Sequence, residues 1–394
     1  MAGFITAEEA AARLGVKKAT LYAYVSRGQL AREKAVDGRH SMFDPDEIDA
    51  LASGRRRPRR GELATAIQSR ITRVDLEHFG YRGQAIESLV TTPFEDVASL
   101  MWCADGSGQP WVDASDTVAV ARRVQSALPD DALLIDRLRA TAAAAPTVDP
   151  LRYDTSQVAG AGQRLITAMV DALPIRGEER SGSLADRLWV RLAPTEPTDV
   201  GVAALNAALV LIADHGLATS TFAVRVAASV RADPYSAVFT GLGAVGGTLH
   251  GAASGQVHRM FVRAAELNSA TAGVSEILRT GNRVPGFGHK VYKHGDPRFA
   301  LLSRLVIDSY RRDLRLLVVN DILNVVSKRI TVLPNIDFAM GALTYLADMS
   351  PDAGEAIFAI GRTAGWLAHA AEEYDEAPVR FRPQARYVGP MDLG

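Results

Sequence analysis

The chain has 394 residues, enough for roughly two or three domains, and its 47% apolar and 23% charged residues are ordinary for a globular protein. Its single cysteine, Cys103, excludes an intrachain disulfide and a cysteine-built zinc site, and it indicates a reducing compartment, for which we expect the cytoplasm. The longest apolar run, residues 202–213, contains Asn206 and is shorter than the roughly 18 residues of a membrane span. The N-terminus carries Glu8 and Glu9 where a signal peptide would be basic, so we do not expect it to be a targeting segment.

The formal net charge is −1, but it is unevenly distributed along the chain. Residues 1–60 contain twelve Lys and Arg against eight Asp and Glu, whereas the remainder contains thirty-two against thirty-seven. We therefore expect the basic N-terminal end and the acidic body to have different partners.

Two short helices are predicted at the N-terminus. Thr6 and Glu9 have the spacing of a capping box, which starts a helix that ends at Gly15. A second helix is predicted over 17–27, with apolar residues at helical spacing, and is closed by Gly28. Two helices that meet across a glycine turn form a helix-turn-helix pattern.

This pattern resembles the small winged modules of excisionase-like and MerR-type regulators, and the similarity continues through a wing at 38–43 to a helix at 46–51. The resemblance implies that one set of residues faces the major groove of DNA, namely Lys17, Lys18, Thr20 and Tyr22, and that Arg39 and His40 contact phosphate. The alternative is a helical pair that docks on a partner protein. The basic run 54–61 is interpreted first as a linker and second as a non-specific phosphate contact.

Helical patterns separated by Gly, Pro or Asp breaks fill the chain from residue 71 onward, and no alternating strands are expected there. Abundant alanine and few β-branched runs also favour an all-α body. We predict helices over 93–102, 116–128, 131–144, 156–173, 184–192, 199–213, 220–230 and 234–245.

Polar residues gather in three patches of this body. The first brings Asp214 and His215 to a loop, and His250 follows after a glycine-rich stretch. In the second, 284–298, three glycines and two prolines preclude a regular helix at the start, so we expect free backbone amides there. Cationic side chains lie beside these amides, a combination that suits phosphates or carboxylates; they are Lys290, Lys293 and Arg298.

The third patch places Asp337 among apolar neighbours just inside a predicted helix start. Partial burial raises the pKa of such a carboxyl and makes it a candidate general base, although capping a helix is the commoner role of an isolated aspartate. Each histidine taken singly is likewise more often structural than catalytic. The functional hypothesis therefore rests on the combination of the patches.

Taken in order, four motifs look like the successive signatures of citrate synthases. They are Asp-His at 214–215 with Ser-Thr-Phe at 220–222, Leu-His-Gly at 249–251, Pro-Gly-Phe-Gly-His at 285–289 with Asp-Pro-Arg at 296–298, and Pro-Asn-Ile-Asp at 334–337. Weaker similarities extend the resemblance from residue 70 to the C-terminus.

The resemblance implies an all-α citrate synthase fold with large and small helical domains, preceded by a small winged helix-turn-helix domain. The expected parts are a DNA-binding-like module at 1–53, a basic linker at 54–61, a large domain at 62–251 with 346–394, and a small domain at 252–345. It also implies a homodimer whose active sites are shared across subunits.

By the same resemblance, Asp337 removes a methyl proton from acetyl-CoA, His250 hydrogen-bonds the thioester oxygen and His289 polarises the ketone of oxaloacetate. A lone carboxylate can remove so weakly acidic a proton only if charge on the oxygen is neutralised as it develops, which agrees with this grouping.

Substrate binding is implied by the resemblance as well. The carboxylates of the 2-oxo acid are expected to bind Arg298, Arg362 and Arg382, the last of which is contributed across the dimer. His215 is expected to add a hydrogen bond. Five further residues are expected along the CoA adenine, namely Val284, Pro285, Gly286, Phe287 and Gly288. The acyl-CoA is a substrate, no cofactor is bound permanently and no metal is required.

The chain departs from the family's usual pattern near the first motif. Ile212, Gly216 and Ala218 stand where His, Glu and Asn are common, while His250, His289 and Asp337 are retained. Propionyl-CoA as substrate, giving 2-methylcitrate, stays open, because one methyl group changes binding by only about 1–3 kcal/mol.

Two functions from different classes follow. One is the condensation of acetyl-CoA with oxaloacetate and water to give citrate and CoA, or its 2-methylcitrate counterpart. The other is a DNA-binding transcriptional regulator whose synthase-like body senses CoA esters or oxo acids. Both are compatible in one dimer that spaces two helix-turn-helix units on a pseudo-palindrome.

Overall fold

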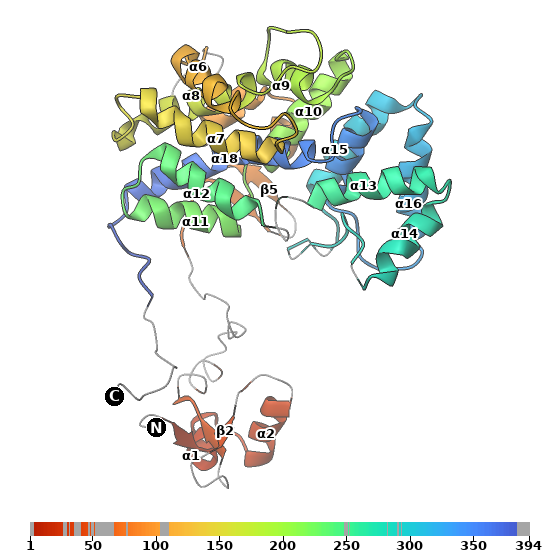
Figure 1. The fold of residues 1–394 in the computed structure, drawn as a ribbon. Coiled ribbons are helices and arrows are strands. Elements are labelled where there is room, and N and C mark those ends of the chain that lie inside the picture. The colour runs from red at the N-terminus through yellow and green to blue at the C-terminus, as the bar shows by residue number, and fades with distance from the viewer. Residues whose placement is uncertain are drawn as a thin grey trace, which may run out of the picture. The chain divides into compact units, whose positions relative to one another are not determined.

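The computed structural model describes residues 4–26, 30, 32–34, 41–45, 48, 51, 67–75, 78–102, 110–247, 251, 253–281, 283–289, 291–292 and 294–383. The chain divides into two compact units, Met1–Gln68 and Ser69–Gly394, and each is described by itself (Figure 1).

The N-terminal unit contains the predicted pair of helices. Helix α1 (Ala7–Arg13) begins after Thr6, whose hydroxyl accepts from the Glu9 amide while the Glu9 carboxylate accepts from the Thr6 amide. The predicted capping box is therefore confirmed. Gly15, at φ +67°, turns the chain towards α2 (Lys18–Ser26).

A small antiparallel sheet completes this unit. Its strands are β1 (Ile5–Thr6), β2 (Glu33–Lys34) and β3 (Ser41–Phe43), in the order β1-β3-β2. Leu21, Phe43 and Ile48 are each at most 1% exposed and form the centre of its core. The helix predicted over 46–51 is represented by helical residues at 45, 48 and 51, while Arg39 and His40 lie outside the described residues.

The C-terminal unit begins with a small sheet that the sequence analysis missed. Strands β4 (Thr72–Val74), β5 (Phe79–Tyr81) and β6 (Gln84–Ala85) pair antiparallel in chain order. The expectation of no strands beyond residue 71 was wrong here, because strands of two or three residues are too short to show an alternating pattern. The buried Tyr81 hydroxyl donates to the Val210 carbonyl at 2.8 Å and attaches this sheet to a later helix.

The rest of the unit is helical, and the eight predicted body helices agree with the observed ones within three residues at each end. The helices are α4 (Ile86–Leu89), α5 (Phe94–Met101), α6 (Ser115–Gln125), α7 (Leu134–Ala144), η1 (Ala145–Val148), η2 (Thr155–Gln157), α8 (Val158–Asp171), α9 (Leu184–Leu192), α10 (Asp199–Ile212), α11 (Thr219–Ser229), α12 (Pro234–Val245), α13 (Ala253–Glu266), α14 (Ala270–Arg279), α15 (Pro297–Tyr310), α16 (Arg315–Ser327), α17 (Ile336–Leu346) and α18 (Ala353–Tyr374).

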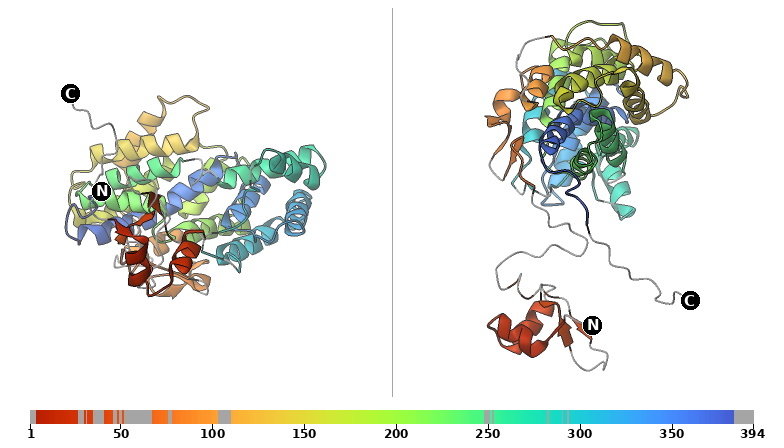
Figure 2. Two further views of the ribbon diagram at one scale, coloured as in Figure 1. Left: turned by 90° about the horizontal axis from the view of Figure 1, so that it is seen from below. Right: turned by 90° about the vertical axis from the view of Figure 1, so that its left-hand side faces the viewer.

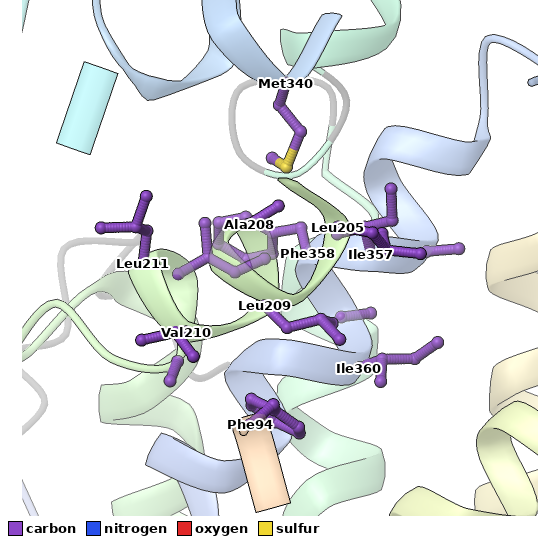
Figure 3. Packing of buried hydrophobic residues seen from close by; sticks show 14 of the residues in the cluster. Phe94, Leu205, Ala208, Leu209, Val210, Leu211, Met340, Ile357, Phe358 and Ile360 are labelled. Carbon is purple, nitrogen blue, oxygen red and sulfur yellow. The ribbon is translucent and has the colours of Figure 1, made fainter. Parts of the chain in front are cut away.

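Helix α18 forms the centre of this unit. It packs against α7, α8, α10, α11 and α12, and nearly all of its residues are buried (Figures 1 and 2). Figure 3 shows its Ile357, Phe358 and Ile360 beside Leu205 and Leu209 of α10. A helix that is buried around its whole circumference is typical of the interior of a large domain, and the polar residues that α18 carries are buried with it.

Helices α13, α14 and α16 gather at one side of the unit, and α17 connects them to the centre by packing on both α13 and α15 (Figure 2). The division of the unit into a large domain at 62–251 with 346–394 and a small domain at 252–345 stays a prediction. Within the described part of the chain, none of the helices is both long enough and apolar enough to cross a lipid bilayer.

Two glycines allow α18 to approach the end of α10 closely. A Cβ atom on Gly365 would lie 2.3 Å from the Ala213 carbonyl oxygen, and one on Gly361 would lie 2.9 Å from the Leu209 carbonyl oxygen. The Gly365 amide donates to the Ala213 oxygen at 3.1 Å. The backbone after α10 is thereby fixed directly on α18.

We predict that Gly365→Ala lowers the free energy of unfolding by about 1–3 kcal/mol, because the added methyl overlaps rigid backbone. Thermal denaturation of the full chain measures this change. Gly160→Ala on α8 is the matched control, since the nearest atom to its added Cβ is 3.5 Å away at the end of the Arg164 side chain. The control should leave the midpoint unchanged or raise it, as alanine favours helix; equal effects of both variants would contradict the prediction.

Candidate functional site

The loop after α10 presents His215. Asp214 beside it is fully buried, and one of its carboxylate oxygens accepts from the Thr72 hydroxyl at 2.6 Å and from the Gly216 amide at 2.7 Å. Gly216 has φ +64°, which a residue with a side chain adopts only with strain. The Asp214 carboxylate therefore closes a tight turn with His215 at its tip.

Three rings meet at this turn. His215 Nε2 lies 3.0 Å from the Tyr292 hydroxyl, and the His215 ring lies edge to face with His289 at a centroid distance of 5.1 Å. Tyr292 stacks on His289 at 4.7 Å. Burial, with the charges of Arg298 and Arg362, lowers the pKa of His215 to about 2, so this ring is neutral.

The proton of His289 is assigned by its backbone contacts. Its Nδ1 accepts from the amides of Val291 and Tyr292 at 3.2 and 3.3 Å. A nitrogen that accepts carries no proton, so the neutral ring is protonated on Nε2. His289 thus presents an N–H donor on its outer edge; Arg298 Nη2, which can only donate, lies 3.4 Å from this nitrogen without forming a hydrogen bond to it.

Two arginines are buried beside these rings, with Arg298 3% and Arg362 2% exposed. Both oxygens of Asp296 bind Arg298, at 2.9 and 2.8 Å, and outweigh burial in holding the pKa of Arg298 above its usual value. Arg362 donates from Nε to the Ile212 carbonyl at 2.7 Å. Planar guanidinium groups held in this way suit the binding of carboxylates.

Asp337 lies in the first turn of α17, partly accessible to solvent. Burial raises the pKa of its carboxyl to about 6, with Asp296 adding to the shift and Arg298 and Arg362 opposing it. A carboxylate of this pKa is suited to take up a proton near neutral pH.

Asn335 connects Asp337 to the turn that precedes His289. Its side-chain oxygen accepts from the Asp337 amide at 3.0 Å, and its side-chain nitrogen donates to the Gly288 carbonyl at 2.9 Å. Gly286 and Gly288 have φ values of +80° and +83°, so glycine is required at both positions of this turn.

The backbone amides of 284–288 differ from expectation at one position. The Gly288 amide donates to the Leu333 carbonyl at 2.8 Å, so it is engaged within the chain and was wrongly expected to be free for a ligand. The Gly286 carbonyl accepts from the Asn335 amide at 2.9 Å in the same way. The sequence could not show these bonds because their partners lie some 45 residues further on.

The structure brings together five of the predicted residues, namely His215, His289, Arg298, Arg362 and Asp337. His250, Lys290 and Lys293 lie outside the described residues. Arg382 is exposed in the segment after α18, beyond Phe381, which packs on Phe222 of α11 at 5.3 Å. The part of the chain that the structure describes has no group of three His, Cys, Asp or Glu residues placed to hold a metal ion.

The sequence analysis quoted Asp296 and Asn335 within its motifs but gave neither of them a role in this cluster. Asp296 and Asn335 stand at helix starts, a signal that could have identified them as caps. No sequence signal indicates Tyr292, or Phe79, whose ring lies 5.6 Å from that of His215.

In the N-terminal unit, three of the residues expected to face DNA are exposed, namely Lys17, Lys18 and Tyr22, whereas Thr20 is half-buried. Lys18 forms an ion pair with Glu8 of α1. Tyr22 lies at an edge-to-face angle to Phe43 of β3, with ring centroids 6.4 Å apart.

Comparison with known families gives two matches. Residues 62–384 match the family described as "Citrate synthase, C-terminal domain". Residues 4–56 match the family described as "Helix-turn-helix domain".

Individual relatives agree with the first match. The chain is 35% identical over 226 residues to citrate synthase 2 of Bacillus subtilis, a stretch that covers 55% of this chain and 59% of that protein. It is 29% identical over 338 residues to 2-methylcitrate synthase 2 of Corynebacterium glutamicum, covering 78% of this chain and 88% of the relative.

Solved structures show the same fold. The citrate synthase of Thermoplasma acidophilum, in a ternary complex with carboxymethyl coenzyme A and oxaloacetate, has a TM-score of 0.70 at 22% identity, covering 84% of this chain and 96% of that one.

We predict that Asp337→Asn raises the thermal midpoint at pH 8 and has little effect at pH 4. The folded-state pKa of about 6 exceeds the usual 3.8, so ionising Asp337 lowers stability as the pH rises through 6, and asparagine removes that cost. The expected shift is on the order of a few degrees. Asp131→Asn, at an exposed position, is the control; a stabilisation independent of pH would argue against a raised pKa.

Proposed function

We propose, since the chain belongs to the citrate synthase family, that it condenses an acyl-CoA with oxaloacetate and water to give a tricarboxylic acid and free CoA. The observation that carries this proposal is that Asp337, with a pKa of about 6, lies with two buried arginines beside His289, whose Nδ1 accepts from two backbone amides and so leaves the proton on Nε2. That set supplies a base, an electrophilic donor and carboxylate receptors in one place.

The reaction begins with proton removal. Asp337 takes a proton from the carbon next to the acyl-CoA thioester, while His250, by family resemblance, hydrogen-bonds the thioester oxygen so that an enol forms. The enol carbon attacks the ketone carbon of oxaloacetate, and His289 Nε2–H stabilises the ketone oxygen as it gains negative charge.

Buried arginines orient the oxaloacetate. Arg298 and Arg362 bind the carboxylates of oxaloacetate, and neutral His215 adds a hydrogen bond. Water then hydrolyses the thioester of the condensed product and releases CoA. The expected contact of Val284, Pro285, Gly286, Phe287 and Gly288 with the CoA adenine is part of this proposal, and no metal ion takes part in any step.

The acyl group is acetyl in this proposal, and propionyl is the alternative. The relatives support both, because one of them is a citrate synthase and another a 2-methylcitrate synthase. A hydrophobic pocket discriminates one methyl group by only about 1–3 kcal/mol, so a single chain can accept both.

We also propose that the chain is a homodimer with Arg382 contributed across subunits. Support comes from exposed apolar side chains on the paired helices α11 and α12 and directly after α11, with Val226 37%, Val230 59% and Phe239 45% exposed. A patch of this kind on a soluble chain commonly marks a protein interface.

A thiol-release assay tests the condensation. With oxaloacetate and acetyl-CoA the full chain should release CoA, and Asp337→Asn should lower kcat by on the order of 10²–10⁴-fold because the general base is lost. Asp131→Asn removes a carboxylate from the exposed surface and should leave kcat unchanged. Replacing acetyl-CoA by propionyl-CoA measures the acyl preference; no release with either thioester would refute the condensation.

A second function, sequence-specific DNA binding, is favoured by the N-terminal unit. Its helix-turn-helix family match and the exposed Lys17, Lys18 and Tyr22 on or beside α2 support this proposal. In such modules the second helix enters the major groove and cationic side chains contact phosphate. A dimeric body would set the spacing of two half-sites.

Selection from a random duplex library, followed by binding titrations at several salt concentrations, tests this function. Lys17→Ala should weaken binding to the selected sequence and relax the base preference at one position, because one contact in the major groove is lost. Arg123→Ala removes the same charge from an exposed position on α6 and should change neither quantity. If no sequence is enriched with or without oxaloacetate and acetyl-CoA, the unit does not read DNA.

A further inference from the structure

The second half of α18 holds buried polar groups that the proposed chemistry does not use. His369 and Glu373 are fully buried, and Arg225 of α11, which contacts both, is 1% exposed. Burying such groups is costly unless each is paired and correctly oriented. Their arrangement leads from the surface segment after α18 to the turn that carries His215.

The hydrogen bond from Arg225 sets the proton position on His369. Arg225 Nε donates to His369 Nδ1 at 3.0 Å. An arginine Nε always carries its hydrogen, so Nδ1 must accept and the neutral imidazole is protonated on Nε2. His369 Nε2 lies 3.4 Å from both carboxylate oxygens of Asp214. The ring therefore donates to Asp214.

Arg225 is itself held in one orientation. Its Nη1 donates to Glu373 at 3.0 Å, and its Nη2 forms an ion pair with Glu372. Both Glu373 oxygens also accept from Arg380, each at 2.6 Å. The guanidinium consequently has little freedom to turn its Nε away from His369.

At the other end of the chain of bonds, Asp214 forms the turn around His215. Burial alone would raise the pKa of Asp214, but the hydrogen bond from His369, the charge of Arg362 and the Thr72 hydroxyl lower it below its usual value, so the carboxylate is ionised. The ionised group accepts from the Gly216 amide at 2.7 Å and holds the turn closed.

We infer that His369 is a positioning residue for the oxo-acid site: oriented by Arg225, it donates from Nε2 to Asp214 and so fixes the turn that presents His215. The inference rests on the proposed function in one respect, that His215 binds the oxo acid. The substrate class affected is the 2-oxo acid and not the acyl-CoA.

Two amide substitutions separate this role from simple filling of space. The side-chain nitrogen of glutamine can take the place of Nε2, so His369→Gln retains a donor to Asp214. The shorter asparagine retains an acceptor for Arg225 but loses the donor. In the thiol-release assay, His369→Asn should raise KM for oxaloacetate about tenfold, as loss of one buried hydrogen bond does. The KM for acetyl-CoA should stay within about twofold.

His369→Gln should have a KM for oxaloacetate close to that of the unsubstituted chain and well below that of His369→Asn. Thr72→Val, which removes the other side-chain donor to Asp214 without changing side-chain shape, should shift the same constant in the same direction and keeps the test valid if the asparagine variant does not fold. Parallel losses in both KM values and in kcat, with no difference between Gln and Asn, would assign His369 a packing role and overturn the inference.

A spectroscopic measurement distinguishes failure of the inference from failure of the proposed function, because it needs no turnover. In the full chain labelled with ¹⁵N-histidine, long-range ¹H–¹⁵N spectra should show His369 protonated on Nε2 alone. Thr72→Val should move the His215 resonances. It should leave unchanged the resonances of His258, a residue of α13 that contacts Thr344 of α17. A His369 protonated on Nδ1, or unchanged His215 resonances, would overturn the inference even in an inactive protein.

Discussion

Helices α10 and α18 cross with no room for a side chain at two positions of α18, and the oxo-acid half of the site depends on that close approach. Gly361 and Gly365 admit backbone atoms of α10 and of the loop after it at contact distance. Arg362, between them, can therefore donate to the carbonyl of Ile212, the last residue of α10. Because the helix ends there, the following residues are free to form the turn that carries His215.

The same site concentrates charge away from water. Arg298 is compensated by Asp296, whose carboxylate also accepts from the Ile336 amide at 3.0 Å and so joins the starts of α15 and α17. The charges of Arg298 and Arg362 only partly offset the burial of Asp337, which keeps a pKa of about 6. The folded chain is less stable when this carboxylate is ionised, but a general base must be ionised to accept a proton. Stability and catalysis therefore favour opposite protonation states of Asp337.

The sequence predicted the parts of this site that depend on local pattern. Long helices with strong periodicity and the capping box at Thr6 were accessible from residue spacing. The grouping of His215, His289 and Asp337 was implied by the resemblance of their ordered motifs to citrate synthases. The contacts that orient those side chains were not. Tyr292 is 77 residues from His215 and His369 is 155 residues from Asp214 in the chain, and neither carries a local signal. The strands β4 to β6 were missed because pairing, not alternation, defines them.

The hydrogen bonds of Asn335 affect how the site can change during evolution. They tie the first turn of α17 to Gly288, so that Asp337 and His289 are held on one small rigid body by amide geometry. Drift in the packing of distant helices can move that body as a whole without altering the spacing of its two reactive groups. Lineages that acquire a different acyl preference can therefore change the surrounding walls and keep the reaction they started with.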